Sequence, residues 1–183
     1  MLEIQKFEIE GLLLLTPKSF SDDRGFFVER YNETRFREAG LPTKFVQDNF
    51  SRSKAGVLRG LHYQQGPTQL KLVTCLSGEI LDVAVDLRKS SPTFGMHQSV
   101  KLSGTKPQWL LVPAGFAHGF LVTSKDAADV MYKVDNYYSP AAEGAILWND
   151  LELGIDWHSV NPNVSAKDQQ ARKWNEFKNF NPF

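Results

Sequence analysis

Two residues that could do chemistry lie three positions apart in the otherwise apolar stretch Gly56–Gln65. Arg59 is a fixed cation, and His62 belongs to the residue type that exchanges protons near neutral pH. Successive side chains of a strand point to opposite faces, so in a regular strand Arg59 and His62 would lie on opposite sides. A bulge at Gly60 would bring them onto one face.

Short strands at regular spacing are predicted on both sides of this stretch, from residue 45 to residue 148. Serine, glycine and proline separate the segments, and no long amphipathic pattern interrupts them. Such a series is typical of an antiparallel sandwich or jelly roll, so we expect an all-β fold with short peripheral helices. The predicted strands are Phe45–Phe50, Val57–Tyr63, Leu70–Leu76, Ile80–Leu87, Met96–Leu102, Gln108–Val112, Ala117–Val122, Val130–Val134 and Ala145–Leu147.

The segment Ile80–Leu87 has the clearest alternation of side chains. Its odd-numbered positions, from Leu81 onward, are apolar, whereas its even-numbered positions include Asp82 and Asp86. The apolar face is expected to be buried. The face with the carboxylates either lines a polar cavity or meets solvent.

Smaller elements are predicted near the N-terminus. Leu12–Thr16 and Phe26–Tyr31 have the composition of outlying strands, with a turn over Ser21–Asp23 between them. Asn32 is a suitable N-cap for a short helix, which Gly40 would end.

A short helix is also predicted near the C-terminus. Ser165 and Asp168 have the spacing of a capping box, and the helix would carry Ala171 and Trp174. The sequence suggests no chemical role for the aromatic residues of this segment, which we expect to cover part of the fold or a dimer interface. They are Trp174, Phe177, Phe180 and Phe183.

Composition limits the class of protein. The 183 residues, 42% of them hydrophobic, suffice for one sizeable core, so we expect a single domain over residues 1–183. Lys plus Arg and Asp plus Glu both total 21, so net charge does not favour nucleic acid or an anionic membrane as a partner. The run Leu12–Leu15 is too short for a membrane span and lacks the basic flank of a signal peptide. Cys75 has no cysteine to pair with, which fits a cytoplasmic protein.

Several segments together resemble the dTDP-4-dehydrorhamnose 3,5-epimerases, a family of small cupin-like enzymes. One of them is the stretch Gly56–Gln65, and the matches extend from about Asp22 to Asp168, which is most of the chain. Any one match is weak, but six further segments in the same order are specific. They are Asp23–Phe27, Gln47–Asn49, Asp86–Arg88, Pro113–Phe120, Tyr132–Lys133 and Ser165–Asp168.

The resemblance implies a cupin-type antiparallel jelly roll and an isomerase that needs no cofactor. The implied substrate is dTDP-4-keto-6-deoxy-D-glucose, inverted at C3 and C5 to dTDP-4-keto-L-rhamnose in dTDP-L-rhamnose biosynthesis. Both carbons flank the C4 ketone, which acidifies their hydrogens. The reaction needs a base on one face of the sugar, a proton donor on the other, and a positive group near the enolate oxygen.

The resemblance assigns these tasks to four residues. His62 is the base, Asp168 orients its ring, and Tyr132 is the proton donor. Lys71 stabilises the enolate oxygen. Each of these residues, taken alone, also has an ordinary structural interpretation, and for Asp168 it is the helix cap described above. Asp82 is a second candidate for the carboxylate that orients His62.

Ten further positions match substrate contacts of the family. The cations Arg24, Arg59 and Lys167 suit the diphosphate. The rings of Phe26 and Tyr138 suit the thymine, although aromatic rings also serve in ordinary cores. The polar positions are Glu29, Gln47, Asn49, His118 and Glu143.

The resemblance also implies a homodimer. In the family, N-terminal strands of one subunit extend the sheet of the other, so Arg24, Phe26 and Glu29 would enter the partner's site. Such pairing would also cover an open sheet edge.

Three alternative functions stay open. Metal-binding cupins carry histidines and a carboxylate where this chain has His62, Gln64, Gln69 and His118, and the two amides make a metal unexpected. A mono-epimerase acting at C3 or C5 of a related dTDP-ketosugar would share most of these motifs. The presence of all four catalytic positions argues against a non-catalytic sugar-nucleotide-binding cupin.

Overall fold

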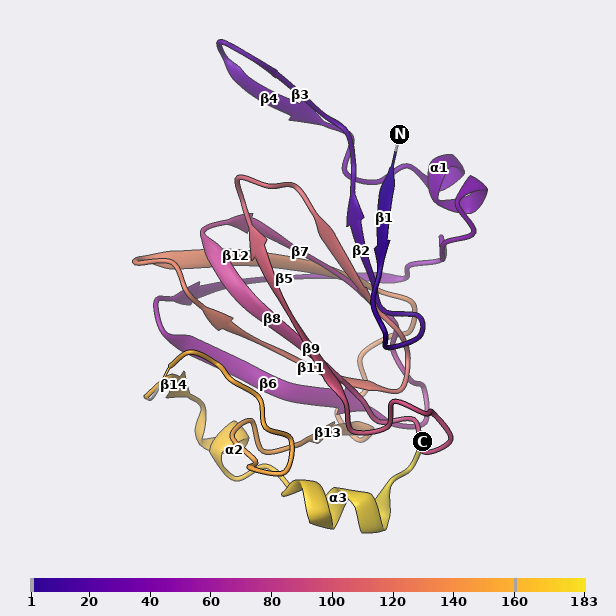
Figure 1. Ribbon diagram of the computed structural model, residues 1–183, viewed down its shortest axis with the longest axis vertical. Coiled ribbons are helices and arrows are strands. Elements are labelled where there is room, and N and C mark those ends of the chain that lie inside the picture. Colours follow the sequence, from indigo (N-terminus) through magenta and orange to yellow (C-terminus); the bar gives the residue numbers. More distant parts are fainter. Residues whose placement is uncertain (1, 160) are drawn as a thin grey trace.

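Two antiparallel sheets face each other in the computed structural model, which describes residues 2–159 and 161–183 (Figure 1). The strands are β1 (Glu3–Lys6), β2 (Leu13–Thr16), β3 (Ser19–Asp22), β4 (Gly25–Val28), β5 (Gln47–Lys54), β6 (Val57–Gln64), β7 (Lys71–Ser77), β8 (Glu79–Asp86), β9 (His97–Ser103), β10 (Trp109–Val112), β11 (Phe116–Val122), β12 (Ala127–Val134), β13 (Glu143–Ala145) and β14 (Asn163–Val164). The helices are α1 (Glu33–Glu38), α2 (Ala166–Gln169) and α3 (Trp174–Phe180).

The strand order confirms the antiparallel jelly roll expected from the sequence. The first sheet runs β1-β2-β10-β7-β12-β5, and the second runs β13-β6-β11-β8-β9. Strand β14 joins the second sheet by parallel pairing with β6. Strands β3 and β4 form a separate hairpin.

An apolar core fills much of the space between the sheets, and strand β8 shows how the sequence builds it. Ile80 and Ala84 point into this inner core, together with Val73 and Val130 of the first sheet. Asp82 occupies the same face of β8, because side chains alternate along a strand. The carboxylate face of the segment is therefore the inner one.

The outer face of the second sheet is also buried. The apolar odd-numbered residues of β8, such as Val83, belong to a second apolar cluster that includes Trp157, Trp174 and Phe177. Figure 1 shows α2 and α3 on the outer side of β6 and β13. The C-terminal part of the chain thus covers the sheet from behind.

The bulge considered at Gly60 is present. His118 of β11 lies opposite His62, but Phe120, two positions on, lies opposite Arg59, three positions back along β6. The extra residue turns Arg59 and His62 onto the same inner face. Gly60 has φ +118°, and a Cβ there would lie 2.6 Å from the Cα of Gly119, so no larger residue fits this crossing.

Helix α1 begins as predicted, since the side chain of Asn32 accepts a hydrogen bond from the Arg35 N–H at 3.1 Å. Ser165 likewise caps α2 through the Asp168 N–H at 3.1 Å. The prediction of one helix reaching Trp174 was wrong, because α2 ends at Gln169 and α3 is separate. Between them, Arg172 pairs with Ile146 in an isolated β-bridge, which extended backbone can make and a helix cannot.

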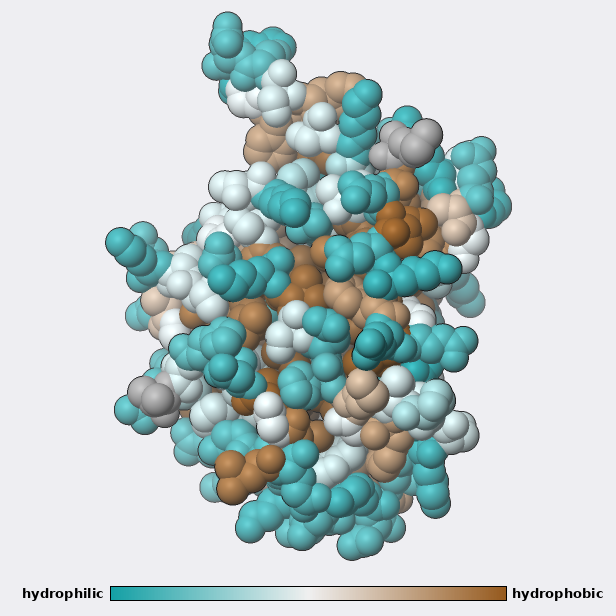
Figure 2. Space-filling model, viewed as in Figure 1, coloured by the Kyte–Doolittle hydropathy of each residue, from teal (hydrophilic) through white to brown (hydrophobic). Residues whose placement is uncertain are grey.

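The N-terminal hairpin β3–β4 projects from the body of the molecule (Figure 1). Ser21 and Asp22 belong to β3 and not to the turn, because they pair with Phe26 and Gly25. The hairpin ends at Val28, earlier than the strand predicted from Phe26. Figure 2 shows hydrophilic atoms at its tip and apolar atoms just behind them. Its exposed aromatic side chains are Phe20, Phe26 and Phe27.

Within residues 2–159 and 161–183, no helix is long and apolar enough to cross a membrane.

Candidate active site

A cavity of about 330 Å³ opens between the two sheets. Many of the residues singled out in the sequence line it, together with three that were not assigned to substrate there. The lining residues are Gln47, Asn49, His62, Tyr63, Gln64, Gln69, Lys71, Tyr132, Tyr138 and Glu143.

Strand register explains how residues far apart in the sequence meet in this cavity. Tyr132 of β12 lies opposite Asn49 of β5 on one side and Val73 of β7 on the other. Opposed residues share a face of the sheet, and Val73 belongs to the inner core, so Tyr132 and Asn49 point inward. Lys71, two positions from Val73, is on the same face.

His62 reaches the cavity from the second sheet and is held from behind by Asp168. Its Nε2 lies 2.7 Å from Oδ1 of Asp168, so Nδ1 is the ring nitrogen left for a substrate. Oδ2 of Asp168 accepts the Gly60 N–H at 3.3 Å. The His62 side chain is 32% exposed, whereas that of Asp168 is 5% exposed. The imidazole is thus accessible and its carboxylate partner is not.

The surroundings of Asp168 keep it ionised. Burial by itself would raise its pKa, but the hydrogen bond and charge of His62, with the bonds from Gly60 and Ser165, outweigh burial and hold the pKa below its usual value. An ionised carboxylate favours the imidazolium that His62 becomes when it takes up a proton.

Burial shifts the pKa values of Lys71 and Tyr132, both in the first sheet, in opposite directions. Burial lowers the pKa of Lys71 to about 8, while the charges of Asp82 and Glu143 partly oppose the change. Burial raises the pKa of Tyr132, and the charge of Arg59 partly opposes that. At neutral pH the cavity therefore holds an ammonium and a phenol that keeps its proton.

A polar cluster closes one side of the cavity. Glu143 accepts the Tyr138 hydroxyl at 3.0 Å and forms an ion pair with Lys167. Burial would raise the pKa of Glu143, but the hydrogen bonds from Lys167 and Tyr138 bring it below its usual value. On the inner face of β6, Arg59 donates from Nε to the Ser53 hydroxyl of the facing sheet at 2.9 Å.

Asp82 does not touch His62, so its candidacy as the orienting carboxylate was wrong. Its two carboxylate oxygens lie 2.8 and 3.0 Å from Nε2 of His118. The reason is the order of strands, since β8 pairs with β11, which separates it from β6. Both side chains are buried, and His118 does not line the cavity.

The three predicted N-terminal contacts do not reach this cavity within one chain. Arg24 lies at the exposed hairpin turn, where it forms an ion pair with Asp22 at 2.6 Å. Phe26 is on the same hairpin and half-exposed. Glu29 forms an ion pair with Arg35 at 2.8 Å.

Two glutamines at the metal-ligand positions of cupins serve a purpose that the sequence did not suggest. Gln64 donates to the carbonyl of Tyr137 at 3.1 Å and accepts the Ser139 N–H at 2.8 Å. Gln69 donates to the carbonyl of Asn136 at 2.9 Å. Both amides therefore fix the loop that carries Tyr138. In the described part of the chain, no group of three or more His, Cys, Asp or Glu side chains is placed to hold a metal ion.

Comparison with known proteins gives a consistent family. The family model described as dTDP-4-dehydrorhamnose 3,5-epimerase matches residues 6–176. The dTDP-4-dehydrorhamnose 3,5-epimerase of Salmonella typhimurium is 53% identical over 174 residues, covering 93% of this chain and 94% of that protein. The dTDP-4-dehydrorhamnose 3-epimerase of Streptomyces niveus is 38% identical over 172 residues, covering 93% of this chain and 83% of that protein.

A solved structure extends the similarity to three dimensions. The dTDP-6-deoxy-D-glucose-3,5-epimerase of Legionella pneumophila, in complex with dTDP-4-keto-L-rhamnose, superposes with a TM-score of 0.91 at 47% identity. The alignment covers 96% of this chain and 94% of that one.

Proposed function

Because the chain belongs to the dTDP-4-dehydrorhamnose 3,5-epimerase family, we propose that its cavity inverts C3 and C5 of dTDP-4-keto-6-deoxy-D-glucose to give dTDP-4-keto-L-rhamnose. The protein is an isomerase. One observation carries the mechanism: His62 and Tyr132 enter a single cavity from facing sheets. A sugar between them meets a base on one side and a proton donor on the other.

The first step is removal of a proton from the carbon next to the ketone. Nδ1 of His62 takes the proton, and the electron pair of the broken C–H bond moves into the enolate. Asp168 holds the ring through Nε2 and stabilises the imidazolium. The Lys71 ammonium faces the cavity and stabilises the enolate oxygen, whose charge is larger than that of the starting ketone.

The second step returns a proton from the opposite face. The Tyr132 hydroxyl donates it to the carbon, and the enolate electrons re-form the ketone with inverted configuration. Burial favours this donor role because it keeps the phenol protonated. The same sequence acts at C3 and at C5, since both carbons flank the same carbonyl group, once His62 has released its proton to solvent and Tyr132 has regained one from it.

The nucleotide is assigned to the polar rim of the cavity. Tyr138, half-exposed at this rim, is proposed to stack on the thymine. Gln47 and Asn49, beside it, and Glu143 are proposed polar contacts, and His118 stays a predicted contact from behind the cavity. Arg59 and Lys167 are proposed to bind the diphosphate.

We also propose a homodimer in which one domain, residues 1–183, lends its hairpin to a second copy. Strand β5 is the open edge of the first sheet, and it carries Gln47 and Asn49 next to the cavity. A hairpin added along this edge would bring Arg24, Phe26 and Glu29 of the second copy to the same cavity. Burial of the hairpin's exposed aromatic rings would favour such pairing.

Mixing two inactive variants tests the shared site. Arg24→Ala and His62→Asn each remove one half of it, so a heterodimer contains one doubly defective and one intact site. After subunit exchange, activity should recover to about a quarter of that of the wild type, as two-fold symmetry requires. No recovery in exchanged heterodimers would contradict the shared site.

The activity itself is tested by NMR of dTDP-4-keto-6-deoxy-D-glucose in deuterated buffer. Deuterium and inversion at both C3 and C5 are expected. Label at C3 alone would instead group the protein functionally with mono-epimerases such as the Streptomyces niveus relative. We propose a cytoplasmic location, supported by the buried free thiol of Cys75.

A further inference from the structure

The carboxylate that holds His62 comes from outside the sheets. Asp168 lies on α2, a helix of four residues. An isolated helix of one turn is unstable, because the conformational entropy lost in forming the first turn outweighs the free energy gained from its hydrogen bonds. The position of Asp168 must therefore be set by the segments on either side of α2.

Before α2, the chain is fixed by strand pairing. Asn163 and Val164 of β14 lie beside Val57 and Leu58 of β6, and the Asn163 N–H donates to the Gly56 carbonyl at 2.7 Å. This attachment is at the start of β6, several residues before His62. It does not fix the segment that follows α2, which needs contacts of its own.

After α2, an aromatic group adds to the attachment that the Arg172–Ile146 bridge makes to the second sheet. Trp174 and Phe177 of α3 are buried, and their rings stack with centroids 5.4 Å apart. The ring of Tyr63, the residue after His62, contacts Phe177 at 5.4 Å and Phe183 at 5.6 Å, both edge to face. We call Trp174, Phe177 and Phe183 the aromatic anchor.

Tyr63 connects the aromatic anchor to the strands that line the cavity. Tyr63 pairs with Gly144 of β13, and a Cβ on Gly144 would lie 2.2 Å from the tyrosine ring. The ring therefore lies directly against β13, next to Glu143. The aromatic anchor supports both β6 at His62 and β13 at Glu143 from behind.

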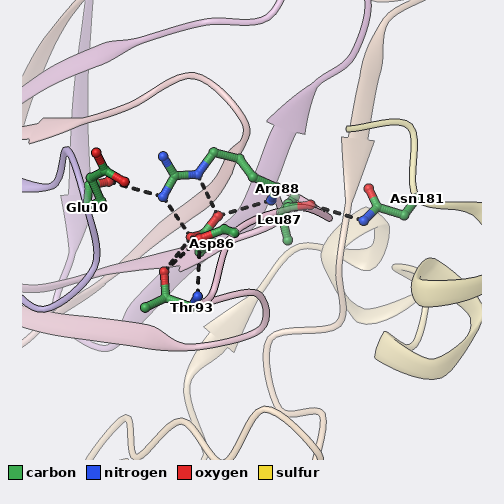
Figure 3. A network of polar contacts seen from close by, with 7 residues as sticks. Glu10, Asp86, Leu87, Arg88, Thr93 and Asn181 are labelled. Atoms are coloured by element: carbon green, nitrogen blue, oxygen red, sulfur yellow. Dashed lines mark hydrogen bonds and ion pairs between the residues drawn. The ribbon is translucent and has the colours of Figure 1, made fainter.

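The far end of the anchor is fixed to the second sheet. The Asn181 side chain donates to the Leu87 carbonyl at 3.1 Å, and the Phe183 N–H donates to the Asn181 side chain at 3.0 Å. Leu87 follows Asp86, whose carboxylate accepts bonds from Arg88 and Thr93 (Figure 3). The end of the chain is thus hydrogen-bonded to Leu87, next to a carboxylate that is itself held by several hydrogen bonds.

We propose that the aromatic anchor is a positioning element, which keeps Oδ1 of Asp168 on Nε2 of His62 and so maintains the base for proton transfer. The inference rests on the proposed function for its catalytic consequence, but the contact it concerns can be observed without substrate. It gives a role to the aromatic C-terminal residues, which the sequence alone left without one.

The contact is tested by the imidazole N–H resonance of His62, assigned by its loss in Asp168→Asn. Phe177→Ala should broaden this resonance or speed its exchange with water. The matched control is Phe180→Ala, which removes the same ring from the same helix where it is half-exposed and lies over Arg172. Phe183→Ala, at a partly buried position, repeats the test if Phe177→Ala does not fold. An unchanged resonance in a folded anchor variant would overturn the proposal.

Kinetics then test the catalytic consequence. Phe177→Ala should lower kcat by about 10-fold to 100-fold with little change in KM, as loss of an outer supporting group does elsewhere. In the Asp168→Asn background the same change should cost no more than about twofold, because the contact it supports is already gone. Equal losses in both backgrounds would show a general packing role and overturn the proposal. Inactive wild-type protein with an anchor-dependent resonance would refute the proposed function and leave the anchor supported.

Discussion

Two histidines that each contact a carboxylate lie side by side on the inner face of the second sheet, and the two pairs differ in what surrounds them. His62 and His118 are direct partners in the strand register, and their Nε2 atoms lie 2.7 and 2.8 Å from Asp168 and Asp82. The His62 side chain is 32% exposed and that of His118 is 8% exposed. The same two groups thus give an accessible imidazole where a cavity reaches the ring, and a sealed polar contact where none does.

The pairs also differ in the origin of the carboxylate. Asp82 lies on β8, which pairs with β11, so its backbone is held by the hydrogen bonds of the sheet. Asp168 comes from the C-terminal segment, through a helix of one turn. The His62–Asp168 pair therefore depends on attachments of the C-terminal segment that the His118–Asp82 pair does not need.

Replacing each histidine in turn with asparagine should give the largest difference in activity between the two pairs. His62→Asn removes the base and should lower kcat by about 10³-fold. His118→Asn removes at most one substrate hydrogen bond, so its effect on kcat/KM should stay below about 10-fold. Rates of inversion at C3 and C5, measured by NMR, give both values. Similar losses in the two variants would mean that the pairs are not functionally distinct.

The pH dependence should reveal the ammonium opposite the His62 pair. Because the pKa of Lys71 is lowered to about 8, its charge is lost as pH rises through that value, well below the ordinary range of lysine. Turnover at pH 9 should be about one-tenth of that at neutral pH, following the protonated fraction. Tyr132 does not produce this loss, because burial raises the pKa of its phenol. Lys71→Arg should abolish the decline at alkaline pH, and an unchanged decline would assign it to another group.

Asp82→Asn should affect stability more than Asp168→Asn does. The amide leaves His118 with a poorer partner in a buried site, so the free energy of unfolding should fall by about 1–3 kcal/mol. Loss of the Asp82 charge also removes a contribution that raises the pKa of Lys71, so the alkaline decline should move to lower pH. Urea unfolding and the pH profile measure the two effects. A larger loss of turnover in Asp82→Asn than in Asp168→Asn would show that the His118 pair, and not the His62 pair, contributes more to catalysis.

Chelation should have the smallest effect. Nε2 of His62 is bonded to Asp168, and the amides of Gln64 and Gln69 are bonded to backbone carbonyls. These donors do not form a strong metal site, so incubation with EDTA should leave turnover unchanged. A loss restored by one added divalent ion would favour the metal-binding alternative.

Local patterns predicted the elements that sit within the sheets. The alternation of β8 correctly placed Asp82 on the face opposite Leu81, and the bulge considered as a condition at Gly60 is present and turns Arg59 onto the face of His62. Strand β14 was not predicted, since two residues give no period. The partner of Asp82 was wrong because strand neighbours are decided by long-range pairing, which a local pattern does not contain.

The candidate site was predictable mainly through the family resemblance. Asp168 shows why, because its N–H bonds to the Ser165 hydroxyl while its carboxylate bonds to His62. The capping role is visible over four residues of sequence, whereas the contact with His62 spans 106 residues. Tyr63 and Gln64, at the end of β6, and Gln69, just before β7, were not assigned to substrate, because the contacts that hold Gln64 and Gln69 at the cavity are with a loop distant in sequence.

The distance along the chain between His62 and Asp168 has a consequence for synthesis on the ribosome. At ordinary translation speeds, the 106 residues that follow His62, up to and including Asp168, take roughly 5–20 s to make. During that interval the residues of β6, including the imidazole, have been synthesised, but the carboxylate that bonds the ring has not. A nascent chain therefore contains the residues of β1 to β13 before it contains Asp168, and the pair proposed to act as the base can form only after the last part of the chain has been translated.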